Sequence, residues 1–178
     1  MSSLSVKSAL RVAALGTLAF GLSACFRPLY GPTASGEPLT ATLAAIDIAP
    51  VTTPLPQERV GHYLRSELTF DLNGSGIPAP KRYRLAMSFT EQAQSPIVDT
   101  STGRAQSATL IGTVTYKLTS LDGKTEITSG TAIGYSTYDR SPQRFATVRA
   151  ARDADIRLAK SLSEQIRTRL ASALATRT

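Results

Sequence analysis

The residue with the most distinctive chemistry is Cys25, the single cysteine of a 178-residue chain. Without a second cysteine it cannot form an intramolecular disulfide. It follows Leu22, Ser23 and Ala24, at the end of an almost unbroken apolar run that begins at Val12. That run has the length of a signal-peptide core and is too short to span a hydrocarbon layer of about 30 Å. The sequence therefore predicts that Cys25 lies directly behind a cleaved leader.

The four residues Leu22-Ser23-Ala24-Cys25 resemble the lipobox of bacterial lipoproteins. The resemblance implies that a diacylglycerol is attached to Cys25 through a thioether. It also implies signal cleavage between Ala24 and Cys25, and a further acyl chain, typically palmitate, on the new amino group. Such chains would anchor the protein to a membrane without any other cofactor. The alternative is an ordinary secretory signal peptide that leaves Cys25 as a free thiol.

The lipobox divides the chain into three parts: a signal peptide at 1–24, a lipidated tether at 25–38 and a single domain at 39–178. Three prolines and two glycines in the tether predict an extended segment. Phe26 stands where an inner-membrane retention signal would usually carry Asp. By resemblance to sorted lipoproteins, this predicts a lipid-anchored protein on the periplasmic face of the outer membrane.

Little else in the sequence is typical of an enzyme. The chain has one histidine, His62, with no second histidine and no carboxylate cluster beside it, so neither a metal site nor a catalytic residue is expected. A Gly-x-Ser-x-Gly nucleophile motif is absent. Removing Lys7 and Arg11 with the leader reduces the formal charge from +7 to +5. Outside the inner membrane this charge favours anionic lipid, glycolipid or acidic protein partners over nucleic acid. The alternative is that the excess charge provides only solubility.

Hydrophobic periodicity predicts the elements of the domain. Strands are expected at 39–51, from Lys81 onward, at 108–118 and at 125–138, with Asp122-Gly123 in the hairpin turn between the last two. In the last strand Ile127, Ile133 and Tyr135 share one parity. Gly130 and Gly134 predict a bulge or a strong twist there. Helices are expected at 57–72 and from 143 to about 173, the second either continuous or kinked, with Ser141 as its cap and Pro142 as its first residue.

This order, β-α-β-β-β-α, predicts an α+β fold. We expect a two-layer sandwich in which an approximately four-stranded, mostly antiparallel sheet carries two helices on one face. The other face of the sheet is expected to be rich in threonine and exposed to water. About 150 residues remain after cleavage, which suits one core.

The segment Cys25-Phe26-Arg27-Pro28-Leu29-Tyr30-Gly31 resembles the start of the lipopolysaccharide-assembly lipoproteins (LptE family), in their alphaproteobacterial form. The element order and length of the domain are also similar to that family. The resemblance implies that the protein plugs and helps to assemble the outer-membrane β-barrel of the lipopolysaccharide translocon. It further implies that the protein assists insertion of lipopolysaccharide into the outer leaflet, so the barrel and lipopolysaccharide are its expected partners.

Phosphates of lipopolysaccharide are expected to pair with basic side chains near strand ends and loops. Seven residues are candidates for this contact: Lys81, Arg82, Arg84, Arg104, Lys117, Lys124 and Arg140. For each of them, ordinary surface charge is the alternative interpretation. An accessory lipoprotein of an ABC-type transporter or of another periplasmic envelope machine, or a purely structural lipoprotein, would share the anchor and the fold class.

Overall fold

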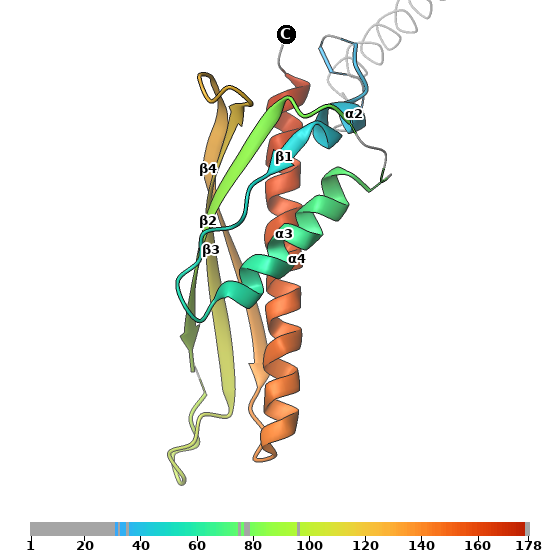
Figure 1. Cartoon of the computed structure of the whole chain (residues 1–178). Coiled ribbons are helices and arrows are strands. Elements are labelled where there is room, and N and C mark those ends of the chain that lie inside the picture. Colours follow the sequence, from blue (N-terminus) through green and yellow to red (C-terminus); the bar gives the residue numbers. More distant parts are fainter. Residues whose placement is uncertain are drawn as a thin grey trace, which may run out of the picture.

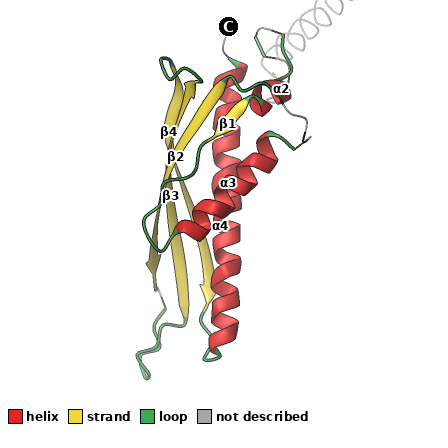
Figure 2. Cartoon of the chain, viewed as in Figure 1, coloured by secondary structure: helices red, strands yellow, loops and turns green. Residues whose placement is uncertain are grey.

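The computed structural model describes residues 31, 33–34, 36–74, 76, 79–95 and 97–176. They form a sheet that is covered on one face by helices (Figures 1 and 2). The predicted leader, Cys25 and most of the predicted tether lie outside these residues. The predicted α+β sandwich is confirmed.

The elements follow the chain in the order α2 (Leu39–Ala44), β1 (Ile46–Ile48), α3 (Glu58–Leu72), β2 (Tyr83–Gln94), β3 (Ser107–Ser120), β4 (Glu126–Asp139) and α4 (Arg144–Ala175). The four strands lie in the sheet in their sequence order. Strand β1 pairs with β2 in parallel, and β2, β3 and β4 form an antiparallel meander. Helix α4 packs against β3 and β4, and α3 packs on α4 and β1.

The last helix is continuous over 32 residues, which corresponds to about 48 Å at 1.5 Å per residue. Its apolar side chains Leu158, Leu162, Ile166 and Leu170 are fully buried. The helix begins later than predicted, because Gln143 is its N-cap and Pro142 precedes it. Ser141 still accepts a hydrogen bond at Oγ from the amide of Gln143 (3.2 Å).

Two glycines let α4 lie directly on the sheet. A Cβ atom at Gly112 would stand 3.0 Å from Leu158, and one at Gly134 would stand 3.1 Å from both Leu158 and Leu162. At Gly130, the corresponding space is filled by the Tyr116 hydroxyl. The glycines of β4 therefore accommodate neighbouring side chains, and the prediction of a bulge at Gly130 and Gly134 is wrong.

The register shift between β3 and β4 instead occurs where Leu118 pairs with Thr128 and Thr119 pairs with Glu126. The extra residue is Ile127, whose side chain packs against the core. Ile133 and Tyr135 have the same sequence parity but lie on the open face, with 48% and 66% of their surface exposed. The bulge separates Ile127 from them, because one extra residue reverses the side-chain alternation.

The first predicted strand is largely a helix. Only Ile46–Ile48 is strand, and Leu39–Ala44 forms α2. Alanine and leucine favour a helix, and Leu39 and Leu43 share one buried face at i, i+4 spacing. The carbonyl of Pro38 accepts hydrogen bonds from the amides of Ala41 and Thr42 and thereby starts the turn.

Candidate functional site

The seven predicted basic residues do not form one cluster. Five of them lie toward the end of the molecule that carries α2, the β3–β4 hairpin and the C-terminal end of α4, at the top of Figure 1. Arg104 and Arg140 lie at the opposite end, where the β2–β3 loop and the β4–α4 turn meet. The upper end is also where the described chain starts, because the amide of Ala34 donates to the carbonyl of Ala175 (3.2 Å).

Three of the five upper residues form ion pairs within the chain. Arg82 contacts Glu37 at 2.8 Å, Arg84 contacts Asp47 at 3.4 Å, and Lys117 contacts Glu126 at 2.8 Å. The hydrogen bond from Lys117, helped by one from Ser129, holds the pKa of Glu126 below its usual value. These pairs neutralise most of the charge that the sequence places on this part of the sheet.

Lys81 has a structural contact as well. Its Nζ donates to the carbonyl oxygens of Ala44 (2.8 Å) and Ile46 (3.0 Å) and so ties β2 to the junction of α2 and β1. Lys124 lies in the β3–β4 turn, where Gly123 has a φ of 74° but Asp122 has no positive φ. The predicted Asp-Gly turn, with positive φ at both residues, is therefore wrong, because the connection runs from Leu121 to Thr125 and is longer than a two-residue turn. Among the described residues, no side chain forms an ion pair with Lys124.

Arg104 and Arg140 line a groove of about 880 Å³ at the lower end, together with Arg144 from the first turn of α4. All three arginines are exposed, and within the described part of the chain none of them forms an ion pair. Asp99 and Asp139 also line the groove. The groove thus presents three guanidinium groups and two carboxylates to solvent.

Backbone hydrogen bonds hold the two sides of this groove together. The amide of Arg140 donates to the carbonyl of Gln106 (2.8 Å), and the amide of Gln106 donates to that of Ile97 (2.9 Å). Within the β2–β3 loop, Asp99 accepts hydrogen bonds from the hydroxyl and amide of Ser101 and from the amide of Thr102. These bonds lower the pKa of Asp99 to about 2, so this carboxylate is charged at neutral pH.

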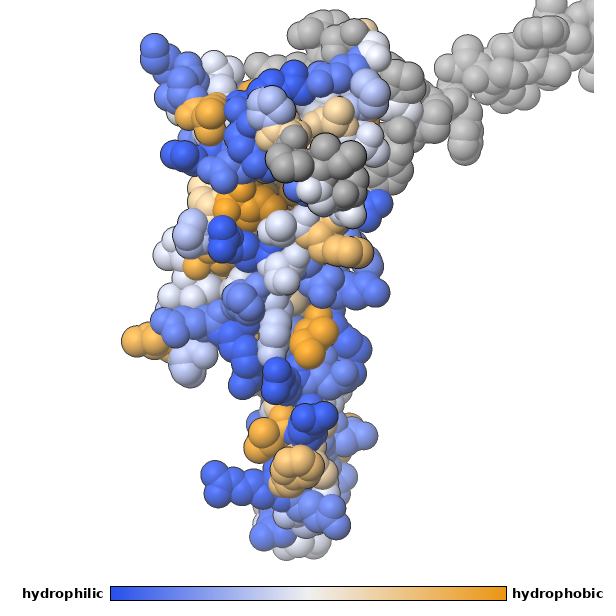
Figure 3. Space-filling model, turned by 45° about the vertical axis from the view of Figure 1, so that its right-hand side comes forward, coloured by the Kyte–Doolittle hydropathy of each residue, from blue (hydrophilic) through white to orange (hydrophobic). Residues whose placement is uncertain are grey.

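The lower end also exposes apolar side chains. Ile97 and Val148 line the groove and are 55% and 56% exposed. Val98 and Phe145, which adjoin the lining segments, are 49% and 77% exposed. Figure 3 shows apolar surface between hydrophilic side chains toward this end. The groove therefore combines cationic and apolar groups, which is the chemistry that a phosphorylated lipid requires.

The sequence prediction included Arg104 and Arg140 but not Arg144. Arg144 follows Arg140 by four residues, across the Ser141-Pro142 turn, and this short spacing is the signal that could have joined them. The apolar residues of the β2–β3 loop were read only as an irregular segment. Their proximity to α4 depends on the pairing of β2 with β3 and of β3 with β4.

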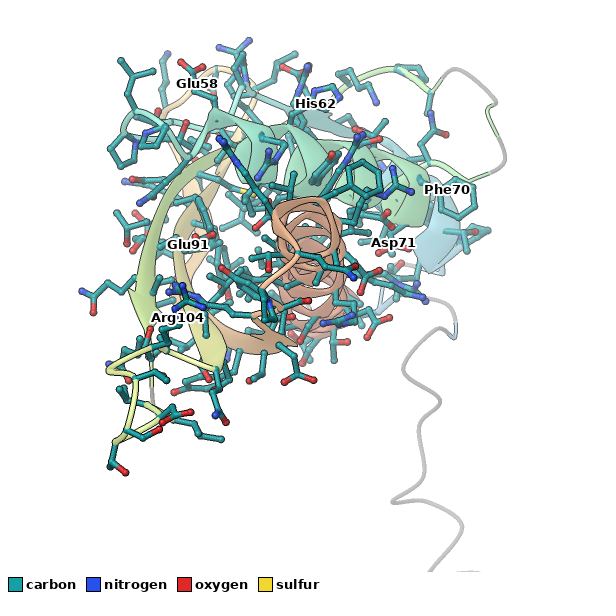
Figure 4. The ribbon with its side chains drawn as sticks, turned by 90° about the horizontal axis from the view of Figure 1, so that it is seen from below. Glu58, His62, Phe70, Asp71, Glu91 and Arg104 are labelled. Atoms are coloured by element: carbon teal, nitrogen blue, oxygen red, sulfur yellow. The ribbon has the colours of Figure 1, made fainter. Side chains whose placement is uncertain are left out.

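His62 lies on the exposed side of α3, as expected, beside a shallow hollow that it shares with Phe70. Figure 4, in which α4 is seen from below, places both residues along α3 and places Glu91 and Arg104 on the side of the sheet. The described residues contain no group of three or more His, Cys, Asp or Glu side chains that could hold a metal ion. None of the helices in this part of the chain is both long and apolar enough to span a membrane.

A family model described as "LptE: Lipopolysaccharide-assembly" matches residues 43–170 of the chain. The protein belongs to the LptE family. This membership agrees with the resemblance of the segment after Cys25 and supports a lipoprotein that serves lipopolysaccharide assembly and is not an enzyme.

Solved structures share the fold. A protein described as a lipoprotein from Caulobacter crescentus is 26% identical, with a TM-score of 0.62 over 78% of this chain and 97% of its own. A minor lipoprotein from Acinetobacter baumannii is 18% identical, with a TM-score of 0.50 over 73% of this chain and 92% of its own, and shows the fold alone. No curated protein matches the sequence.

Proposed function

We propose that this LptE-family protein is an outer-membrane lipoprotein that plugs and helps to assemble the β-barrel of the lipopolysaccharide translocon, and assists lipopolysaccharide insertion into the outer leaflet. Its signal peptide would be removed between Ala24 and Cys25, and Cys25 would carry diacylglycerol and an N-acyl chain. Family membership over residues 43–170 supports the general role. The groove at the lower end supports a direct contact with lipopolysaccharide.

The observation that carries this proposal is a set of three arginines that form no ion pair with any other described residue and that lie next to exposed apolar side chains. Arg104, Arg140 and Arg144 can each donate charge-assisted hydrogen bonds to phosphate oxygens. Ile97 and Val148 offer apolar surface to the acyl portion of the same molecule. Asp99 and Asp139 would repel a phosphate placed beside them, so they restrict where an anionic group can bind.

The arrangement of the two ends agrees with this role. The described chain begins beside the C-terminal end of α4, whereas the groove lies at its N-terminal end, about 48 Å away along the helix. A chain anchored through Cys25 would therefore hold the groove away from the leaflet that holds its acyl chains. The open face of the sheet carries Thr113, Thr115 and Thr131, which suit the hydrophilic interior of a barrel, beside the exposed side chains of Ile133 and Tyr135.

Charge reversal in the groove tests the lipid contact. We expect Arg104→Glu/Arg140→Glu to weaken binding of purified lipopolysaccharide by about tenfold or more, since each charge-assisted hydrogen bond contributes about 1.5–3 kcal/mol. Surface plasmon resonance on immobilised lipopolysaccharide measures this. Arg149→Glu/Lys160→Glu is the matched control, because it makes the same change in charge at exposed positions of α4 outside the groove. Equal losses in both variants would exclude the groove as the binding site.

Purification from detergent-solubilised outer membrane, with a tag at the C-terminus, tests the partner. We expect the translocon barrel to copurify in a stable complex. Recovery of inner-membrane transporter subunits without the barrel would instead favour the alternative role, an accessory lipoprotein of an ABC-type transporter or another envelope machine. Together, the two experiments separate lipid binding from barrel binding.

A further inference from the structure

Strand β4 is an edge of the sheet, and its composition favours pairing with another strand. Among the strands of the described residues, it pairs with β3 alone, on one side. Residues 127–138 contain no charged residue and no proline, and within them residues 130–137 alternate small side chains with β-branched and aromatic ones. Uncharged edges of this kind are templates for strand addition, and proteins usually protect them with lysine, proline or a covering element.

Side chains from α4 protect this edge. Arg157 Nη2 donates to the carbonyl of Thr137 (2.9 Å), Gln165 Nε2 donates to that of Ile133 (3.1 Å), and Arg169 Nη1 donates to that of Thr131. These carbonyls point away from β3, so they are the acceptors that an added strand would use. We call Arg157, Gln165 and Arg169 the α4 row.

The spacing of the α4 row follows from the geometry of the two elements. Every fourth helical residue advances about 6 Å, and every second residue of an antiparallel strand advances about 6.8 Å. Because α4 runs back along β4, helix positions 157, 161, 165 and 169 face strand positions 137, 135, 133 and 131. Position 161 is a serine, which is too short to reach the edge, and among the described residues no α4 side chain donates to the Tyr135 carbonyl.

The natural occupant of an uncovered β4 edge is a second copy of β4. Ile133 and Tyr135 are exposed on the open face near the centre of the strand. In a two-fold antiparallel pair of β4 strands, these side chains would meet their counterparts and form apolar cross-strand contacts. The segment has no like charges to oppose this pairing. The surface is therefore self-complementary except for the α4 row.

We propose that the α4 row keeps the protein monomeric by occupying the edge carbonyls of β4, and that removing the row converts this edge into a self-association surface for two copies of the chain. This proposal does not depend on lipopolysaccharide binding or on the translocon. It assigns Arg157, Gln165 and Arg169 a role in specificity of association that none of the candidate lipid-binding residues has.

The triple variant Arg157→Ala/Gln165→Ala/Arg169→Ala tests the proposal in the mature lipoprotein, solubilised in detergent. Light scattering coupled to size-exclusion chromatography gives its protein mass. We expect the unsubstituted protein to be monomeric and the triple variant to dimerise at least tenfold more tightly. The matched control is Arg149→Ala/Lys160→Ala/Ser172→Ala, which removes the same charge from exposed α4 positions and should remain monomeric.

Two further variants assign the interface. Adding Ile133→Lys/Tyr135→Lys to the triple variant should restore the monomer, because charges on an edge strand oppose pairing. If the triple variant does not fold, Gln165→Ala alone removes the central donor and should shift the equilibrium part of the way toward dimer. The proposal would be overturned if the triple variant is folded and monomeric, or if the dimer persists after the two lysines are added. If the triple variant does not fold, a strictly monomeric Gln165→Ala would overturn it.

Discussion

At the scale of single residues, the least favourable environment belongs to Glu91. Its carboxylate oxygen Oε2 is buried and has no hydrogen-bond partner among the described residues, although Gln57 binds the backbone amide and carbonyl of the same residue. Burial raises the pKa of Glu91, and the nearby charge of Asp155 raises it further, while Arg59 opposes both. The folded state therefore holds a proton on Glu91 more tightly than the unfolded state does.

This shift predicts how stability changes with pH. Because the folded pKa is raised, the contribution of Glu91 favours folding at low pH and is lost as the pH rises from the usual value near 4.5 through the raised one. Glu91→Gln removes that dependence, so we expect the variant to gain stability relative to the parent as the pH rises. Urea unfolding between about pH 4 and pH 8 measures this.

The control for Glu91 is Glu164→Gln, which makes the same substitution at an exposed position of α4. The assigned environment would be contradicted if both variants changed the pH dependence of the unfolding free energy equally. It would also be contradicted if Glu91→Gln had the same pH dependence as the parent. Asp99 affects the pH dependence of stability with the opposite sign. Because its folded pKa is lowered to about 2, its contribution to stability is present at neutral pH and is lost only as the medium becomes strongly acidic.

The sequence could not predict these residue-level contacts, because the partners are far apart in the chain. The environment of Asp155 is not predicted from the sequence. In the structure it is 4% exposed and accepts hydrogen bonds from Arg59, 96 residues away, at 2.6 and 3.0 Å. His62, in contrast, was placed correctly on the exposed side of α3, since helical periodicity alone determines that position.

At the scale of the elements, periodicity predicted α3, the three long strands and α4 well, because their apolar positions repeat over many residues. Periodicity failed where small residues are compatible with two different structures. The alanines before Ile46 fitted a strand but form α2, and the glycines of β4 suggested a bulge but allow α4 to approach the sheet. Only the packing of neighbouring elements distinguishes these cases.

That close packing gives a prediction for Gly134→Val. The added side chain would enter the space held by Leu158 and Leu162, with its first atom only 3.1 Å from each of them. We expect the free energy of unfolding to fall by about 1–3 kcal/mol, as for overpacked cores. Chemical denaturation provides the measurement. Thr131→Val, on the same strand but on the open face, is the control and should change stability by less than about 0.5 kcal/mol.

If Gly134→Val is as stable as the parent, α4 is able to move away from the sheet. The α4 row would then be expected to lose its contacts with β4, because the acceptor carbonyls of Ile133 and Thr137 lie on either side of this glycine along the strand.

At the scale of the whole molecule, the seven candidate basic residues were predicted as one class because they lie near strand ends. A sequence pattern predicts where strands end, but it does not show which strand ends lie at the same end of the folded molecule. The meander places Lys117 and Lys124 at the end near α2, and Arg104 and Arg140 at the other. The carboxylates that pair with the upper residues, such as Glu37 and Asp47, come from segments before α3.

The separation of the two ends predicts that anchoring and lipid recognition are independent. Cys25→Ala should abolish acylation and yield either an uncleaved precursor or a soluble product, because the predicted attachment uses the thiol itself. Its affinity for purified lipopolysaccharide should stay within about twofold of the parent, since the groove lies about 48 Å from the upper end. Palmitate labelling and membrane washing measure acylation and anchoring, and surface plasmon resonance measures the affinity for lipopolysaccharide.

Ser23→Ala serves as the control for the anchor, because it keeps a small residue before the cleavage site and leaves Cys25 in place. It should be labelled and retained like the parent. A Cys25→Ala protein that still incorporates palmitate and stays in washed membranes would refute the lipobox. A Cys25→Ala protein that loses both the anchor and its affinity for lipopolysaccharide would mean that the acyl chains contribute to binding, and the groove would then not be a self-sufficient site.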